Sequence, residues 1–292
     1  MPTVDSRISR RFDALRASGE LGLVAYITAG DPHLAATHKF VQALAQAGAD
    51  VIELGIPFSD PLADGPTIQR ASERALKNRV TLAQVIDLVR EIRKSPAPAN
   101  EIPLVLFSYY NPILQMGLEK FAAAASQAGA DGVLATDLTP EEAEEYCRAM
   151  RAHNLDTIFL GAPTSTDERL AKIAQASSGF LYLISRTGVT GAKESLPEDL
   201  PALLRRARRV TQLPITVGFG ISLPGHVSVL GGLADAAAVG SALVAEIETA
   251  TAHGSSDAAV QRAENALSEK IRSLKEAARH GLSRRASSEV AP

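Results

Sequence analysis

The sequence is poor in cysteine and has no histidine pattern typical of a metal site. One cysteine among 292 residues cannot form a disulfide within the chain. This residue, Cys147, lies on a helical pattern, and we interpret it as a passive thiol. The six histidines include no pair at the spacing of metal ligands. We therefore assign neither a disulfide nor a metal.

The sequence also lacks strong local charge and long apolar runs. The net charge is −3, and the one dense basic run, residues 205–209, is typical of a solvated helix face rather than a nucleic-acid interface. No apolar run has the length of a membrane span, and no secretory signal is present. We expect a cytoplasmic enzyme that has neither nucleic acid nor a membrane as a partner.

Apolar segments recur along the chain as strands that alternate with helices. The predicted strands cover residues 22–28, 51–54, 103–108, 132–136, 156–160, 180–184, 214–218 and 236–239. The predicted helices cover residues 5–17, 33–47, 81–94, 118–128, 140–153, 166–176, 197–210, 224–231 and 257–279. Most strands are continuous apolar runs, which is typical of a parallel sheet covered on both faces.

The strand-helix units also resemble one another. Residues 46–52 (QAGADVI) return as residues 127–133 (QAGADGV), each with a helix end, a glycine cap and the start of a strand. Such internal similarity favours a closed ring of like units over an open sheet. We therefore predict an α/β fold, a (β/α)8 TIM barrel with an extra N-terminal helix. Residues 1–279 are expected to form a single catalytic domain and residues 280–292 a disordered tail.

Three acidic residues stand out where a short apolar strand passes into a proline-rich loop, at residues 51–66. Glu53 lies inside the strand, where burying a charge is costly unless an opposite charge pairs with it or the group has a function. Asp60 and Asp64 follow in the loop, and such a layout is typical of an active site on a parallel α/β scaffold. Structural roles are the alternative. Glu53 would then pair with a base inside the barrel, Asp64 would cap the helix that begins near Pro66, and Asp60 would face solvent or a partner.

Glycine-rich loops follow the last three predicted strands. Residues 218–222 (GFGIS) follow the seventh strand and residues 240–242 (GSA) the eighth, and their backbone can approach an anion closely. The loop at residues 185–191 combines three hydroxyl residues with two glycines and is interpreted as a lid. This end of a TIM barrel commonly binds phosphate, so the three loops together favour a phosphate site over simple tight turns.

Together these motifs resemble the α subunit of tryptophan synthase, an indole-3-glycerol-phosphate lyase, over nearly the whole chain. The most specific segments are residues 53–66, 185–191, 218–222 and 240–241. The resemblance implies a carbon-carbon lyase of L-tryptophan biosynthesis, which cleaves indole-3-glycerol phosphate by a retro-aldol reaction to indole and glyceraldehyde 3-phosphate. It also implies no cofactor in this subunit, and a pyridoxal-phosphate β subunit that receives the indole, with an α2β2 heterotetramer expected.

The resemblance further implies roles for individual residues. Glu53 corresponds to the general acid/base, and Asp64 to the carboxylate that accepts a hydrogen bond from the indole nitrogen. Tyr182 corresponds to a pocket tyrosine, and Thr190 to the threonine of the closing loop that meets the second acid. The other positions correspond to the phosphate-binding backbone, at Gly191, Gly220, Gly240 and Ser241, or to the indole pocket, at Tyr26, Phe107, Leu134, Leu160 and Phe219.

Two other functions stay open from the sequence. A stand-alone lyase that releases free indole would use the same residues without an obligate partner. A non-catalytic binding protein that keeps the phosphate site would be expected to have lost one of the two acids, and both Glu53 and Asp64 are present.

Overall fold

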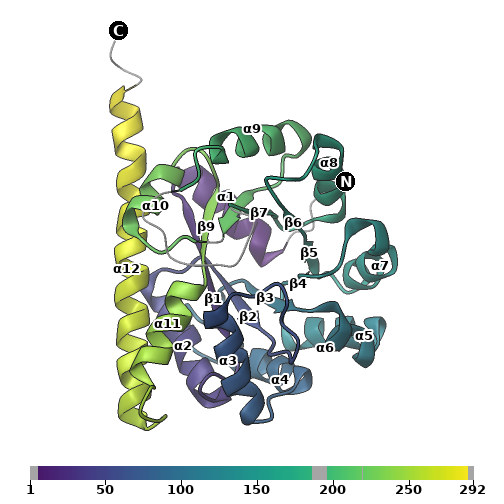
Figure 1. Ribbon diagram of the computed structural model, residues 1–292, viewed down its shortest axis with the longest axis vertical. Coiled ribbons are helices and arrows are strands. Elements are labelled where there is room, and N and C mark those ends of the chain that lie inside the picture. The colour runs from purple at the N-terminus through teal and green to yellow at the C-terminus, as the bar shows by residue number, and fades with distance from the viewer. Residues whose placement is uncertain (1–5, 186–195, 219, 289–292) are drawn as a thin grey trace.

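The structure, a computed structural model, describes residues 6–185, 196–218 and 220–288, with side chains described up to residue 279. Within these ranges it has one sheet of parallel strands, in the order β5-β4-β3-β2-β1-β9-β8-β7-β6. The strands are β1 (Gly22–Thr28), β2 (Val51–Gly55), β3 (Leu104–Ser108), β4 (Gly132–Ala135), β5 (Asp156–Ile158), β6 (Leu160–Gly161), β7 (Leu181–Ile184), β8 (Ile215–Gly218) and β9 (Ala236–Val239). Helices surround this sheet, which confirms the predicted TIM barrel (Figure 1).

The sheet closes because its two end strands are consecutive in the chain. β5 and β6 are separated only by Phe159, whose carbonyl oxygen accepts a hydrogen bond from the Tyr182 N–H at 3.3 Å. Ile158 and Leu160 pack in the interior of the barrel and Phe159 in the outer core, so the side chains alternate across the break as they do in one strand. The predicted strand 156–160 therefore runs as one continuous extended segment. Its first part pairs with β4 and its last part with β7, so the structure has two short strands there.

Helices cover the outside of the sheet. They are α1 (Arg7–Ser18), α2 (Leu34–Ala47), α3 (Pro66–Lys77), α4 (Leu82–Ile92), α5 (Tyr110–Met116), α6 (Leu118–Ala128), α7 (Glu144–Ala152), α8 (Asp167–Ala176), α9 (Leu200–Val210), α10 (Pro224–Leu230), α11 (Ser241–Ala250) and α12 (Asp257–Ser288), with a 3-10 turn, η1 (Pro140–Glu142), before α7. The sequence did not predict α5 and α11. Both were hidden by loop motifs, because α5 contains an internal proline and α11 begins inside the Gly-Ser motif.

The first helix, α1, closes the bottom of the barrel, as its apolar face predicts. Ile8, Phe12 and Leu15 are fully or almost fully buried, and the Phe12 ring packs on that of Phe180, with centroids 5.7 Å apart. Ser6 caps the helix through a capping box with Ser9, which fixes its first turn. The amino-terminal end of the barrel is therefore filled with apolar side chains, and the opposite end is left for a site.

The last helix, α12, runs along one side of the barrel beside α2, α10 and α11 (Figure 1). Its buried Lys275 binds Asp50, with Nζ and Oδ2 2.8 Å apart. The helix continues to Ser288, which differs from the disordered tail expected from residue 280 onward; residues 289–292 lie outside the described part.

Candidate active site

A pocket that is open to solvent at its mouth lies at the carboxyl ends of the strands. Side chains from β1, β2, β3, β7 and β9 form its floor, and the loops after β2, β8 and β9 form its rim. Its lining residues are Tyr26, Glu53, Ala63, Asp64, Gly65, Ile68, Phe107, Tyr182, Gly220, Ile221, Ala238, Gly240 and Ser241. The lining combines apolar and aromatic side chains with a few polar groups, which is typical of small-molecule sites.

Glu53 lies at the floor of this pocket. It sits on β2 between Tyr26 of β1 and Val105 of β3, and its side chain is 1% exposed. Neither carboxyl oxygen has a hydrogen-bond partner among the described residues, so the alternative of a structurally paired acid is not supported. Burial raises the pKa of Glu53 to about 8. The carboxyl group is therefore mostly protonated at neutral pH and free to exchange its proton with a ligand.

Asp64 lies at the rim, in the loop between β2 and α3. It does not cap α3, because the N-cap residue of that helix is Gly65 and no side chain makes the cap hydrogen bond. Its Oδ2 accepts a hydrogen bond from the Tyr109 hydroxyl at 3.2 Å. Partial burial raises the pKa of Asp64 to about 6, while the hydrogen bond from Tyr109 acts in the opposite direction. At pH 7 the group is mainly a carboxylate, so the two acids of the pocket have opposite protonation states.

Aromatic rings form the walls between these acids. Tyr26 and Phe107 meet edge to face, with centroids 5.1 Å apart, and Tyr182 stands on β7 across the barrel. Burial raises the pKa values of Tyr26 and Tyr182 well above the usual tyrosine range, so both hydroxyls stay protonated. Aromatic and apolar side chains together with two tyrosine hydroxyl groups are well suited to bind an aromatic ring system.

The structure brings together most of the predicted site residues that it describes. Eight of them line the pocket: Tyr26, Glu53, Asp64, Phe107, Tyr182, Gly220, Gly240 and Ser241. Leu134 and Leu160 instead pack against the apolar cluster inside the barrel and are not among the lining residues. Thr190, Gly191 and Phe219 lie outside the described residues.

Sequence reasoning missed several lining residues, namely Ala63, Gly65, Ile68, Ile221 and Ala238. Ile68 lies in the first turn of α3, directly after the acidic loop, and no pattern in the sequence marks it as a lining residue. Asp60, by contrast, is exposed and outside the lining, and it accepts a hydrogen bond from the Ser59 hydroxyl at 2.5 Å.

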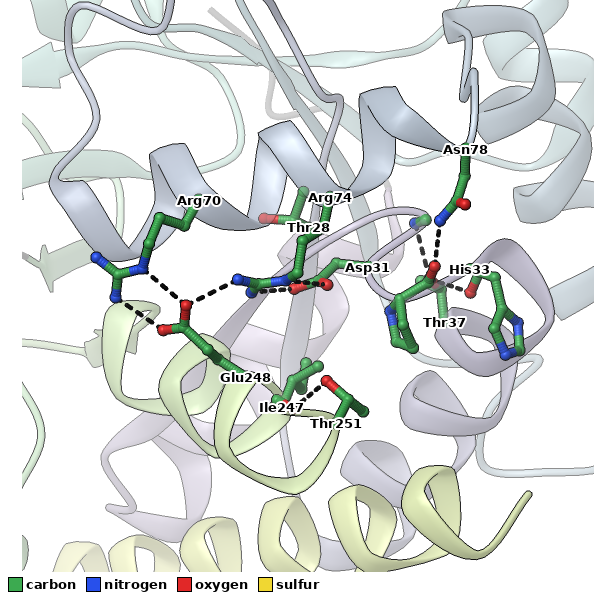
Figure 2. Close-up of polar contacts among 12 residues, drawn as sticks. Thr28, Asp31, His33, Thr37, Arg70, Arg74, Asn78, Ile247, Glu248 and Thr251 are labelled. Carbon is green, nitrogen blue, oxygen red and sulfur yellow. Dashed lines mark hydrogen bonds and ion pairs between the residues drawn. The ribbon is translucent and has the colours of Figure 1, made fainter. Parts of the chain in front are cut away.

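A chain of ion pairs joins the helices that begin at the two sides of the pocket (Figure 2). Arg74 of α3 bonds both oxygens of the buried Asp31, each at 2.8 Å, and also Glu248 of α11 at 2.8 Å. Arg70, one turn earlier in α3, makes a two-pronged contact with Glu248 at 2.7 Å. α3 follows Asp64 directly and α11 begins at Ser241, so the network fixes the two rims relative to each other.

Two further properties concern ligands and membranes. In the part of the chain that the structure describes, no three His, Cys, Asp or Glu side chains gather as a metal site would require. None of the helices in the described ranges is both long and apolar enough to cross a membrane.

Comparison with known proteins agrees with this geometry. A family model described as Tryptophan synthase alpha chain matches residues 12–279. The tryptophan synthase alpha chain of Solibacter usitatus (strain Ellin6076) is 53% identical over 243 residues, which cover 83% of this chain and 90% of that one. The corresponding chain of Geobacter sulfurreducens is 48% identical over 247 residues, covering 85% and 92%.

Solved structures agree as well. The tryptophan synthase subunit alpha from Legionella pneumophila str. Paris superposes with a TM-score of 0.83 at 38% identity, covering 94% of this chain and 99% of that one. With such agreement in sequence and structure over most of its length, the chain belongs to the tryptophan synthase alpha chain family and is a lyase that cleaves indole-3-glycerol phosphate.

Proposed function

We propose that Glu53 carries out the proton transfers of the cleavage, in the order acid and then base. The observation that carries this proposal is the buried Glu53 carboxyl group, which lines the pocket and has no hydrogen-bond partner among the described residues. Its pKa of about 8 makes it a proton donor at neutral pH. A group whose pKa is near the working pH can both give and take a proton, which the reaction requires.

The reaction breaks the bond between the indole ring carbon and the glycerol phosphate chain. Protonated Glu53 gives its proton to that ring carbon, and the resulting carboxylate then removes the proton from the hydroxyl group on the adjacent side-chain carbon. The oxygen forms a carbonyl, the carbon-carbon bond breaks, and its electron pair restores the aromatic ring. Glu53 ends the cycle protonated, as it began, and the products are indole and glyceraldehyde 3-phosphate.

Asp64 has a separate role in this proposal. Protonation of the ring carbon places positive charge toward the ring nitrogen, whose N–H can donate to a carboxylate. An ionised Asp64 at the rim stabilises that charge more in the transition state than in the substrate, which lowers the barrier. The different surroundings of the two acids support this division, because full burial keeps Glu53 protonated while partial exposure keeps Asp64 ionised.

The phosphate group is proposed to bind at the rim formed by Gly220, Gly240 and Ser241. Gly240 is the N-cap residue of α11, and Ser241 is its first helical residue. The free N–H groups and the dipole at a helix amino-terminus favour an anion. Binding the phosphate there fixes the ring and the reacting bond between Glu53 and Asp64, which lowers the entropic cost of reaction.

The family also suggests which cofactors, which partner subunit and which cellular location to expect. These side chains supply proton transfer and charge stabilisation, and we propose that the chain needs no metal or organic cofactor. We also propose that a β subunit receives the indole in an α2β2 assembly and that the complex works in the cytoplasm. Release of free indole by the isolated chain is the alternative, and it would appear as high turnover that a β subunit does not increase.

Glu53→Gln tests the central role, because glutamine keeps the shape of the side chain and removes the transferable proton. Acid-base catalysis contributes about 100-fold or more, so we expect indole release from indole-3-glycerol phosphate to fall by at least that factor. Asp60→Asn is the matched control, since it neutralises an exposed acid seven residues away and should change turnover of the isolated chain little. Unchanged indole release in Glu53→Gln would overturn the mechanism.

A further inference from the structure

Tyr109 lies directly after β3 and touches the loop that carries Asp64. Its side chain is buried, and its hydroxyl group makes two hydrogen bonds to that loop. It donates to Asp64 Oδ2 at 3.2 Å and accepts from the backbone N–H of Ala63 at 2.9 Å. A tyrosine hydroxyl has one proton and two lone pairs, so both bonds can exist at once.

The ring of Tyr109 makes a third contact with the same loop. It stacks on Phe58, with centroids 5.0 Å apart and an angle of 29° between the ring planes. Phe58, Ala63 and Asp64 all lie between β2 and α3, so one side chain that follows the neighbouring strand β3 holds this loop near both of its ends. Burial also raises the pKa of Tyr109, so the hydroxyl keeps the proton that it donates.

We infer that Tyr109 is a positioning residue, which fixes the Asp64 carboxylate in the orientation that receives the ring nitrogen of the substrate. The inference rests on the proposed role of Asp64. The bond from Tyr109 is made to one carboxylate oxygen, and a carboxylate can accept at its other oxygen as well. Tyr109 itself is not among the lining residues of the pocket, so it acts through Asp64 rather than on the substrate.

The hydrogen bond also affects the charge of Asp64. It favours the ionised form, because a hydroxyl donor stabilises a carboxylate more than a carboxylic acid. The other titratable groups in the pocket are Glu53, Tyr26 and Tyr182, and a substitution at Tyr109 leaves all three in place. A change in the pH dependence that follows loss of the hydroxyl therefore reports on the bond between Tyr109 and Asp64.

Tyr109→Phe removes the hydroxyl and keeps the ring that stacks on Phe58. We expect kcat/KM for indole-3-glycerol phosphate to fall about tenfold, as for loss of one hydrogen bond to a charged group. The acid limb of its pH profile should move to higher pH. Tyr110→Phe is the matched control, since the Tyr110 ring instead packs on Tyr146 of α7, and this variant should keep both rate and profile.

A double-mutant cycle separates positioning from a general structural effect. In an Asp64→Ala background the hydroxyl has no carboxylate to hold, so adding Tyr109→Phe should change kcat/KM less than about twofold. A tenfold loss that persists in that background, or a Tyr109→Phe variant with the wild-type rate and profile, would overturn the inference and leave the proposed function intact. Full activity of Asp64→Ala alone would overturn the role of Asp64, and the inference with it. Thermal unfolding of each variant shows that the comparison is made on folded protein.

Discussion

The hydroxyl oxygen of Tyr26 lies 2.1 Å from the position that a Cβ atom would take on Gly55. The two residues are on the neighbouring strands β1 and β2, and the ring edge fills the space that any other side chain at Gly55 would need. The same relationship recurs across the barrel, where the Tyr182 hydroxyl lies 2.2 Å from the Cβ position of Gly218. Glycines at two strand ends thus give both pocket tyrosines room to lie against the sheet.

Gly55→Ala is expected to displace the Tyr26 ring toward the pocket. Ring atoms as well as the hydroxyl lie within 2.8 Å of the added methyl group, so a small side-chain rotation cannot relieve the overlap. Overpacking of this kind lowers the stability of the fold by about 1–3 kcal/mol. The displaced Tyr26 ring should also narrow the pocket and raise KM for indole-3-glycerol phosphate about tenfold. Gly225→Ala is the control, because nothing lies within 4 Å of its Cβ position. Equal KM values for the two variants would contradict this account.

The pH dependence of kcat/KM is expected to be bell-shaped. Activity requires Asp64 as a carboxylate and Glu53 as a protonated acid, and their pKa values are about 6 and about 8. The rate should therefore rise through pH 6 as Asp64 ionises and fall through pH 8 as Glu53 loses its proton. Steady-state assays of the isolated chain between pH 5 and pH 9 measure both limbs, and an alkaline limb absent up to pH 9 would argue against Glu53 as the acid.

Glu53→Gln is also expected to change how stability depends on pH. The folded state holds the proton of Glu53 up to about pH 8, whereas the unfolded chain releases it near the ordinary value of 4.5. Between these pH values the folded state binds more protons, so the contribution of Glu53 to stability is fully present below 4.5 and is lost as the pH rises toward 8, by about 1.4 kcal/mol per pH unit. Urea unfolding at pH 5 and pH 7 should show the wild type losing about 2–3 kcal/mol relative to the variant. Parallel behaviour of the two proteins would show that Glu53 is not buried as a neutral acid.

Arg74→Met is expected to destabilise the fold by leaving the Asp31 carboxylate buried without its partner. Asp31 is 1% exposed, and burial raises its pKa while Arg74 opposes that shift. Removing one member of a buried pair costs about 3 kcal/mol or more, and adding Asp31→Asn should recover part of the loss. Arg70→Met removes the more exposed contact to Glu248 and should cost clearly less. Urea denaturation of the four proteins measures these differences; equal losses for Arg74→Met and Arg70→Met would contradict the account.

The sequence predicted the strands well because burial on both faces leaves a simple apolar signal. It also singled out Glu53, because an acid inside such a strand is conspicuous, and the structure places this residue in the pocket; its catalytic role stays a prediction. Contacts made by long polar side chains across the fold left no such signal. The bond from Tyr109 to Asp64 joins residues 45 positions apart, and the pairing of Arg74 with Asp31 and Glu248 joins two helices and the loop after β1. Their partners depend on where the barrel places each strand end, which only the tertiary structure determines.

The order of the strands has a consequence for how the chain folds. Every pairing in the ring joins strands that follow each other in the chain except that of β1 with β9, which aligns Gly22 with Ala236. Most of the sheet can therefore grow by short loop closures, but β1 keeps an unpaired edge until residues 236–239 have been synthesised. α12 follows and packs on α2 from the first half of the barrel and on α10 and α11 from the second. This helix therefore packs across the seam between the first and last strands, and the nascent β1 edge is open to wrong pairing only until β9 has been made.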